Sequence, residues 1–245
     1  MPINVFISGS TAGIGLGIAR TFKTEGCQVA VNGRDLGRVH SVAQEIGALA
    51  VPADVSTPDG CQAVAEVLAA EWDKIDVLIC NAGSGRSVPP GEETPDEWER
   101  MLRLNLFSVT NLVRVCEDLF SEEGGSIVCI SSICGLETLG APLAYSSAKA
   151  ALHSYVAGAA RPLARKNIRI NAVAPGNIFF EGGTWDRKSN EDPAAIREML
   201  ARDVPMQRFG TVNDVAAAVS FLSSTKASFI TGSILVVDGG QSRSF

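Results

Sequence analysis

A tyrosine and a lysine four residues apart are the residues whose spacing most directly suggests chemistry. Tyr145 and Lys149 lie in the run Tyr145-Ser146-Ser147-Ala148-Lys149, and on a helix both side chains point to one face. A tyrosine hydroxyl is protonated at neutral pH, and a neighbouring ammonium favours the phenolate and lowers its pKa. The pair predicts a group that exchanges a proton with an alcohol oxygen. Because this spacing also arises by chance in helices, the prediction depends on the surrounding motifs.

A serine thirteen residues before the tyrosine could hold the same substrate oxygen. Ser132 follows the apolar run Ser126–Ile130, which is typical of a buried strand. A hydroxyl at the end of that strand, facing the Tyr145 helix, would donate a hydrogen bond to the oxygen. Cys134, two residues further on, is expected to line the same pocket.

A glycine-rich turn near the amino end could bind a diphosphate. The turn Ser8–Gly15 lies between an apolar strand and a helical pattern, with glycines at positions 9, 13 and 15. Glycines let the backbone approach a diphosphate, and the following helix points its amide N–H groups at it. The spacing differs from the general Gly-x-Gly-x-x-Gly fingerprint, and an ordinary strand–helix turn is the alternative.

Apolar runs of strand length alternate with helical patterns along the chain. The strand-like runs cover residues 5–7, 28–31, 49–53, 77–80, 127–130, 168–173 and 234–237. The helical patterns cover residues 14–25, 36–46, 60–72, 96–120, 144–166 and 213–222, with a polar loop expected before the last of them. This alternation predicts an α/β fold, with a doubly wound parallel seven-stranded sheet, helices on both faces and Rossmann-type topology. We expect one domain over residues 1–245.

Composition narrows the functional classes. The net charge of −6 gives no basic surface for nucleic acid or an anionic membrane, and no apolar run approaches the roughly 18 residues of a membrane span. The first residues carry no basic segment and are expected to form a strand instead of a signal peptide. Six scattered cysteines predict reduced thiols in a cytoplasmic protein without a metal site. His40 and His153 are expected on helix surfaces or in packing.

Together the motifs resemble the short-chain dehydrogenase/reductase family in its compact single-domain form. The matching motifs are Gly9-x-x-x-Gly13-x-Gly15, Asn81-Ala82-Gly83, Ser132, Tyr145-x-x-x-Lys149 and Pro175-Gly176. The carboxyl-terminal motifs Arg208-Phe209-Gly210, Phe229–Gly232 and Val237–Gly240 are similar to the 3-oxoacyl-carrier-protein-reductase-like branch. The resemblance implies an enzyme that moves a hydride between a nicotinamide cofactor and a carbonyl or secondary alcohol substrate, with Tyr145 as acid/base.

The resemblance also implies a role for each matching residue. The catalytic set is Asn105, Ser132, Tyr145 and Lys149, in which Asn105 helps to hold a proton-relay water. Cofactor-binding residues are Gly9, Ser10, Thr11, Gly13, Ile14 and Gly15 for the diphosphate and adenosine, Asp54 and Val55 for adenine, Asn81, Ala82, Gly83, Tyr145 and Lys149 for ribose, and Pro175, Gly176 and Ile178 for nicotinamide. For Asp54 the alternative is an N-terminal helix cap, which Ser56 could equally supply.

The end of the second predicted strand favours NADP over NAD. NAD enzymes of this fold generally place an acid there for the ribose 2′-hydroxyl, whereas this chain has Gly33 followed by Arg34. A guanidinium suits a 2′-phosphate. Ala12 contributes no second basic group for the phosphate. The alternative, compatible with NAD, is that Arg34 stacks on adenine, with the acid Asp35 one residue away.

Two stretches depart from the family pattern. Phe180 occupies the position of a threonine that often contacts the cofactor, and we expect residues 179–200 to cover the substrate, with a solvated loop as the alternative. Four acids, Glu117, Asp118, Glu122 and Glu123, replace the basic residues that suit an acidic carrier protein and predict that such a partner is repelled. Arg86 and Arg103 either reach the cleft or are solvated.

Small residues along the helical pattern 144–166 permit close approach of a second copy, and the resemblance implies a homo-oligomer, a tetramer or a dimer. The alternatives to an NADP-dependent reductase are an enzyme acting on a sugar-derived or carrier-linked ketone with NAD, and a non-catalytic dinucleotide-binding sensor. A sugar-nucleotide epimerase or dehydratase shares the tyrosine–lysine pair but usually has a longer chain.

Overall fold

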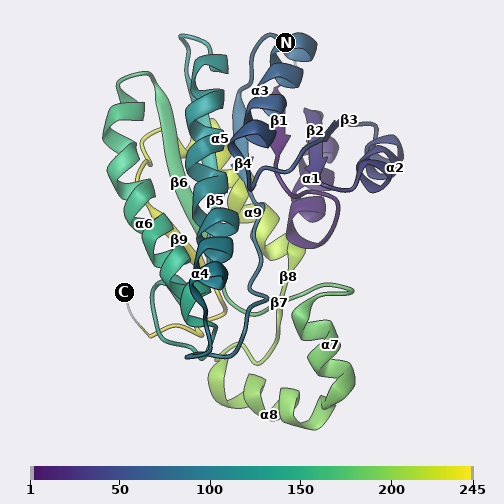
Figure 1. Cartoon of the computed structure of the whole chain (residues 1–245), viewed down its shortest axis with the longest axis vertical. Helices are drawn as coiled ribbons and strands as arrows, with labels where there is room; N and C mark the ends of the chain where they lie inside the picture. Colours follow the sequence, from purple (N-terminus) through teal and green to yellow (C-terminus); the bar gives the residue numbers. More distant parts are fainter. Residues whose placement is uncertain (1–2, 244–245) are drawn as a thin grey trace.

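Seven parallel strands form one sheet through the middle of the protein (Figure 1). The structure is a computed structural model and describes residues 3–243, so residues 1, 2, 244 and 245 lie outside the description. The strand order is β3-β2-β1-β4-β5-β6-β9, and each neighbouring pair is parallel. The predicted doubly wound, Rossmann-type sheet is therefore confirmed.

The elements follow the predicted order, with boundaries that differ by a few residues. The sheet strands are β1 (Asn4–Ile7), β2 (Gln28–Gly33), β3 (Leu49–Pro52), β4 (Val77–Cys80), β5 (Gly125–Ile130), β6 (Ile168–Pro175) and β9 (Ile234–Val237). The predicted helices are α1 (Gly13–Thr24), α2 (Leu36–Ile46), α3 (Pro58–Trp72), α4 (Pro95–Leu102), α5 (Ser108–Cys116), α6 (Leu143–Ala164) and α9 (Val212–Ser223).

Side chains within each strand alternate between two apolar cores. Phe6 joins the core formed with α3, α5 and α6, whereas its neighbours Val5 and Ile7 join the core formed with α1, α2 and α9. In β4, Leu78 and Val77 divide in the same way. This alternation shows that strand residues facing either way are buried, which explains the near-continuous apolar runs.

The single helix predicted over residues 96–120 is interrupted, and that prediction was wrong in detail. Between α4 and α5 the chain forms a π-helical turn over Arg103–Phe107, and a 3-10 turn follows at Glu117–Leu119. The π-helical turn contains the fully buried Asn105, whose amide donates hydrogen bonds to the backbone oxygens of Met101 and Ser84, 3.1 Å away in each case. A wider turn of this kind often marks a functional position.

The polar loop predicted between β6 and α9 is instead structured. It contains β7 (Ile178–Phe179), α7 (Thr184–Glu191), α8 (Pro193–Asp203) and β8 (Gly210–Thr211), and β7 pairs with β8. Neither α7 nor α8 has a buried residue, and the charged side chains that both helices carry had indicated a loop. Figure 1 shows both helices beyond one end of the main sheet.

Candidate active site

The predicted site residues meet at the carboxyl ends of the strands. The turn after β1, the loop after β4, the segment after β5 and the loop after β6 all line two contiguous cavities, of about 420 and 790 Å³. Parallel sheets of this type bind ligands at this edge. The fold therefore brings residues from distant parts of the chain to one place.

The glycine-rich turn has room for a diphosphate and little room for larger residues. Gly9 and Gly13 have φ values of +60° and +52°, which favour glycine. A Cβ atom at Gly15 would lie 2.5 Å from the carbonyl oxygen of Gly9. Ala12, which precedes α1, makes no side-chain capping hydrogen bond, so the first amide groups of the helix remain available for an anion. These features fit the diphosphate of a dinucleotide.

Two asparagines hold this turn in place, and sequence reasoning missed their function. The Asn32 Oδ1 atom accepts from the Gly9 amide at 3.1 Å, and its Nδ2 atom donates to the Val51 oxygen at 2.9 Å. The Asn81 Nδ2 atom donates to the Gly9 oxygen at 2.8 Å, so its amide positions the turn as well as bordering the cavity. The available signal for Asn32 was one polar residue at the end of an otherwise apolar strand.

A smaller cavity of about 230 Å³ lies at the other side of the turn. Thr11, Arg34, Asp54 and Val55 line it, together with Asn81, Ala82 and Gly83, all of them predicted cofactor-binding residues, so this cavity is the candidate adenosine site. Asp54 accepts hydrogen bonds from the backbone amide and the hydroxyl of Ser56. The alternative role for Asp54 or Ser56 as a helix cap is wrong, because Thr57 caps α3.

Ser132, Tyr145 and Lys149 come together where the two larger cavities meet. Tyr145 lines both of these cavities. Ser132 lines the cavity of about 790 Å³, and Lys149 lines the cavity of about 420 Å³. Lys149 is 3% exposed, and its Nζ atom donates to the Ile130 oxygen at 2.8 Å. The Nζ atom lies 5.8 Å from the centre of the Tyr145 ring. A phenol, a hydroxyl and an ammonium therefore converge within reach of one ligand.

Burial dominates the titration of this pair. It raises the pKa of Tyr145 to about 12, opposed by a hydrogen bond with Ser132, and it lowers the pKa of Lys149 to about 8. The pKa of Tyr145 is therefore raised, in contrast to the lowering that we expected from Lys149. The phenol stays protonated at neutral pH, and most of the lysine side chains still carry the charge.

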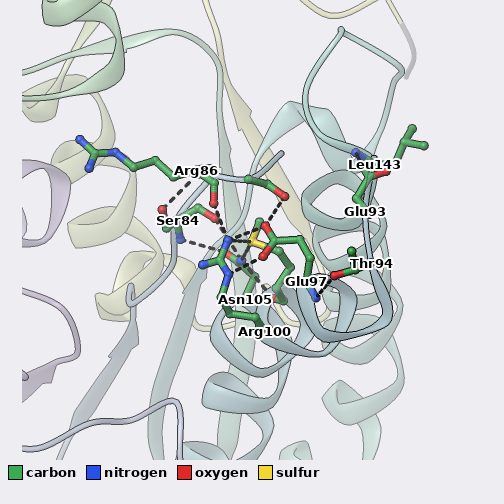
Figure 2. Close-up of polar contacts among 10 residues, drawn as sticks. Ser84, Arg86, Glu93, Thr94, Glu97, Arg100, Asn105 and Leu143 are labelled. Atoms are coloured by element: carbon green, nitrogen blue, oxygen red, sulfur yellow. Dashed lines mark hydrogen bonds and ion pairs between the residues drawn. The ribbon is translucent and has the colours of Figure 1, made fainter. Parts of the chain in front are cut away.

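Asn105 clamps the loop that follows β4, as Figure 2 shows. Its Oδ1 atom accepts from the Ser84 amide at 3.0 Å, and its Nδ2 atom donates back to the Ser84 oxygen. On the other side of the loop, Arg100 donates to the Arg86 oxygen at 2.8 Å while it pairs with Glu97 at 2.6 Å. A Cβ atom at Gly83 would lie 2.8 Å from the Asn105 Oδ1 atom and 3.4 Å from the Lys149 Nζ atom. Asn105 thus lies beside the lysine without a direct hydrogen bond to it.

The loop after β6 forms the remaining wall. Pro175, Gly176 and Ile178 line the larger cavity, as does Phe180. A Cβ atom at Gly13 would lie 2.8 Å from the Cε2 atom of Phe180, so the Phe180 ring packs directly on the diphosphate turn. The aromatic ring therefore occupies a position at which a threonine would offer a hydroxyl group.

His153 is a further polar residue of the site that sequence reasoning assigned to a helix surface or to packing. Its Nε2 atom lies 2.7 Å from the Ser131 Oγ atom, and Ser131 lines both cavities. Burial lowers the pKa of His153, assisted by the Lys149 charge. The ring is therefore neutral at pH 7 and serves to position Ser131.

The described residues show neither a metal-binding cluster nor a disulfide. Among residues 3–243, no cluster of three or more histidine, cysteine or acidic residues could hold a metal ion. All six cysteines are free, and Cys134 lines the larger cavity as predicted. Within the described part of the chain, no helix has the length and hydropathy needed to cross a membrane.

Comparison with known proteins gives a consistent result. The enoyl-(acyl carrier protein) reductase family model matches residues 9–242. The 3-oxoacyl-(acyl-carrier-protein) reductase FabG of Staphylococcus aureus is 32% identical over 98% of this chain and 98% of its own. L-sorbose reductase from Gluconobacter frateurii, solved with NADPH and L-sorbose, has a TM-score of 0.94 at 28% identity and covers 100% of this chain and 98% of its own. A 7α-hydroxysteroid dehydrogenase, solved with NADH and 7-oxo glycochenodeoxycholic acid, has a TM-score of 0.89 at 32% identity, covering 98% and 94%.

Replacing Asn32 by alanine should destabilise the fold and loosen the diphosphate turn. The change leaves the partly buried Gly9 amide and the oxygen of the buried Val51 without this partner, at a cost of about 1–3 kcal/mol in the free energy of unfolding. Urea unfolding measures this loss. Asn190→Ala is the matched control, because among residues 3–243 the Asn190 amide bonds only to Asp186, on the surface of α7, and the change should alter stability by less than about 0.5 kcal/mol. Equal stability of the two variants would contradict the role of Asn32.

His153 should make the protein sensitive to acid. Its pKa is lowered on folding, so its contribution to stability is complete above the unfolded pKa of about 6.5 and is lost as pH falls through the folded value. In His153→Gln that loss disappears, and the free energy of unfolding should fall less steeply between pH 7.5 and 5.5 than in the wild type. The loss of the Ser131 hydrogen bond shifts the variant equally at every pH. If the free energies of unfolding of the two proteins, each from urea unfolding, decreased with falling pH by the same amount, His153 would not titrate in this way.

Proposed function

The chain belongs to the short-chain dehydrogenase/reductase family, as its motifs predicted, and is an NAD(P)-dependent oxidoreductase; we propose that it transfers a hydride between NADP(H) and a ketone or secondary alcohol, with Tyr145 as acid/base. The observation that carries the proposal is the position of Tyr145, at the junction of the cavity below the glycine-rich turn and the larger cleft. A cofactor bound on the turn supplies the hydride.

The side chains of the site then handle the substrate oxygen. The Ser132 hydroxyl donates a hydrogen bond to that oxygen and fixes its position. In reduction the protonated Tyr145 hydroxyl gives its proton to the oxygen, which agrees with a pKa raised to about 12. The ammonium of Lys149 stabilises the phenolate that remains, and its free donors hold the cofactor ribose. Asn105 keeps the β4 loop beside the lysine, where a relay water returns the proton.

The cofactor preference follows from Arg34. Arg34 lines the adenosine cavity, and Asp35, the nearest acid, already caps α2 by accepting from the Arg38 amide at 2.9 Å. Asp35 is thus committed to the helix, and the guanidinium is available for a 2′-phosphate. This supports NADP as the cofactor. The alternative is that Arg34 stacks on the adenine of NAD. The affinities of the protein for NADPH and NADH distinguish the two roles of Arg34.

Helices α7 and α8 form the proposed cover over residues 179–200. Trp185 of α7 packs on Phe209 with ring centres 5.4 Å apart, and Phe179 contacts the same ring at 5.9 Å. The Asn177 amide reaches the Met199 sulfur of α8 at 3.6 Å. These contacts attach the cover to the loop after β6 and to Phe209 before β8, beside the cavity that Trp185 and Met199 line.

Ketones are the substrate class that the relatives suggest. L-sorbose reductase was solved with L-sorbose, a ketose, and the 7α-hydroxysteroid dehydrogenase with a 7-oxo steroid acid. The FabG relative is named as a reductase of a carrier-linked 3-oxoacyl group. The acids Glu117, Asp118, Glu122 and Glu123 precede β5 at its amino end, and Glu117 pairs with Lys166 at 2.8 Å. The cleft lies at the carboxyl ends of the strands, away from these acids. Their charge is therefore not an argument against a carrier-linked substrate in the cleft, which corrects our expectation from the sequence.

Helix α6 also supports assembly as a homo-oligomer. Ala150, Ala157 and Gly158 are exposed on it, and a Cβ atom at Gly158 would meet nothing within 4 Å. A surface of small residues lets a second copy of the helix approach closely, in a dimer or tetramer.

Replacing Tyr145 by phenylalanine should reduce kcat by at least about 100-fold, because the proton donor is lost. The dissociation constant of NADPH should stay within about threefold, since the ring itself remains in place. The decrease in NADPH absorbance with a ketone that the wild type reduces measures the rate. The chain has two tyrosines, and Tyr155→Phe on the same helix is the matched control, with activity retained. A Tyr145→Phe enzyme with more than a tenth of the wild-type rate would exclude Tyr145 as the acid/base.

Replacing Arg34 by alanine should weaken NADPH about tenfold and leave NADH nearly unchanged, because only NADPH carries the 2′-phosphate. Dissociation constants for both cofactors, measured at one salt concentration, provide the test. Arg38→Ala is the control, since Arg38 lies four residues further on, in the first turn of α2, but does not line the cavity. The change at Arg34 is cleaner than an acid at position 33, where a Cβ atom would lie 3.0 Å from Thr11 Cγ2. Equal weakening of both cofactors would refute the assignment of NADP.

A further inference from the structure

The large cleft beside Tyr145 has a charge opposite to that of the whole protein. Its charged lining consists of the cationic residues Arg86, Arg187 and Lys188 and a single acid, Asp203. Both carboxylate oxygens of Asp203 accept hydrogen bonds from Arg202, at 2.9 and 2.8 Å, so this acid is already neutralised. The chain as a whole has a net charge of −6. The cleft is therefore a local positive region on an acidic protein.

We propose that the substrate ketone carries an oxyanion group, a carboxylate or a phosphate, which binds to Arg86, Arg187 and Lys188. The proposal rests on the function proposed above and names the substrate class of that site. It assigns the cationic residues to the part of the substrate away from the reacting carbonyl, which Ser132 and Tyr145 hold at the inner end of the same cleft.

Arg86 is presented to the cleft by a rigid backbone. Asn105 holds Ser84 from one side and Arg100 holds the Arg86 oxygen from the other, so the loop is fixed on both sides of the residue. Figure 2 shows the Arg86 side chain extending away from the Glu97–Arg100 ion pair. The adjacent Gly85 passes close to the catalytic residue, because a Cβ atom there would lie 3.8 Å from the Cζ atom of Tyr145.

The guanidinium of Arg86 has no ion-pair partner among residues 3–243. Arg103, the other arginine that could have reached the cleft, pairs with Glu99 and does not line it. A planar guanidinium binds carboxylate or phosphate with two parallel hydrogen bonds. Of the two arginines, only Arg86 is therefore free to bind an anion in the cleft.

Arg187 and Lys188 bring two more positive charges from the cover. Both lie on α7, and the described part of the chain contains no ion-pair partner for either side chain. The Lys188 Nζ atom lies 4.9 Å from the centre of the Trp185 ring, which is itself held by Phe209. An anion bound between α7 and the β4 loop would join the cover to the fixed wall of the site.

The cofactor is a competing source of anionic groups. Arg86 also lines the smaller cavity below the glycine-rich turn, whereas Arg187 and Lys188 line only the larger cleft. If the cations served the cofactor diphosphate, their removal would weaken NADPH. Binding of the cofactor must therefore be measured beside binding of the substrate group.

Isothermal titration calorimetry on the full chain, saturated with the oxidised cofactor NADP, measures the dissociation constants of two pairs of probes. One pair is 4-oxopentanoate and its methyl ester, and the other is dihydroxyacetone phosphate and dihydroxyacetone. We expect the anionic member of at least one pair to bind about tenfold more tightly than the neutral member, and the advantage to fall as salt is raised. The pair that shows the advantage identifies carboxylate or phosphate as the group recognised.

Arg86→Met and Arg187→Met should each remove most of this advantage and leave the NADP dissociation constant within about twofold. Arg197→Met on α8 is the control, because Arg197 is exposed on the same cover and does not line the cleft; it should keep the advantage. Equal binding of charged and neutral probes in both pairs, absence of binding by both anions, or variants that bind like the wild type would each overturn the proposal.

A rate measurement with the same four probes separates this inference from the function on which it rests. Turnover of neutral ketones without any anion preference would contradict the oxyanion site and leave the reductase function intact. Anion binding that depends on Arg86 and Arg187, with no hydride transfer to any ketone, would support the oxyanion site and contradict the reductase function.

Discussion

All seven strands of the sheet run in one direction, so their carboxyl ends meet at a single edge. Parallel pairing of β1 with β4, of β4 with β5, and of β5 with β6 fixes the order in which the loops after them meet. The turn at Gly9, the loop at Gly83 and the hydroxyl of Ser132 each follow directly from one of these strands. The site depends on this constraint because its residues come from segments that are far apart in the sequence.

A buried ammonium is the second demand that shapes the site. Lys149 is 3% exposed, and its charge is costly there unless donors find acceptors. The Ile130 oxygen supplies one acceptor, and the wider turn at Asn105 keeps polar groups beside the lysine without consuming them. The same low polarity raises the pKa of Tyr145, so its hydroxyl is protonated at neutral pH.

Much of this arrangement could be predicted from the sequence. Apolar runs predicted every strand of the main sheet, and the glycine spacing with Tyr145 and Lys149 predicted the family and the edge where the site lies. What could not be predicted depends on contacts between distant residues. Asn32 reveals its function only when the Gly9 amide is seen beside it, and the pKa of Tyr145 depends on the packing around it. The π-helical turn was missed because its residues continue the pattern of a regular helix, and α7 and α8 were missed because their exposed, charged residues resemble a loop.

The absence of buried residues from α7 and α8 has a consequence for how such proteins diverge. Substitutions in a core change stability, and most of them are lost because they unfold the protein. Substitutions in these two helices touch neither apolar core, so they are nearly free of that restriction. Selection can therefore alter the wall of the cleft while the sheet, the glycine-rich turn and the Tyr145–Lys149 pair stay unchanged. In this architecture one wall of the cleft can therefore change in shape and charge without a cost in the stability of the sheet.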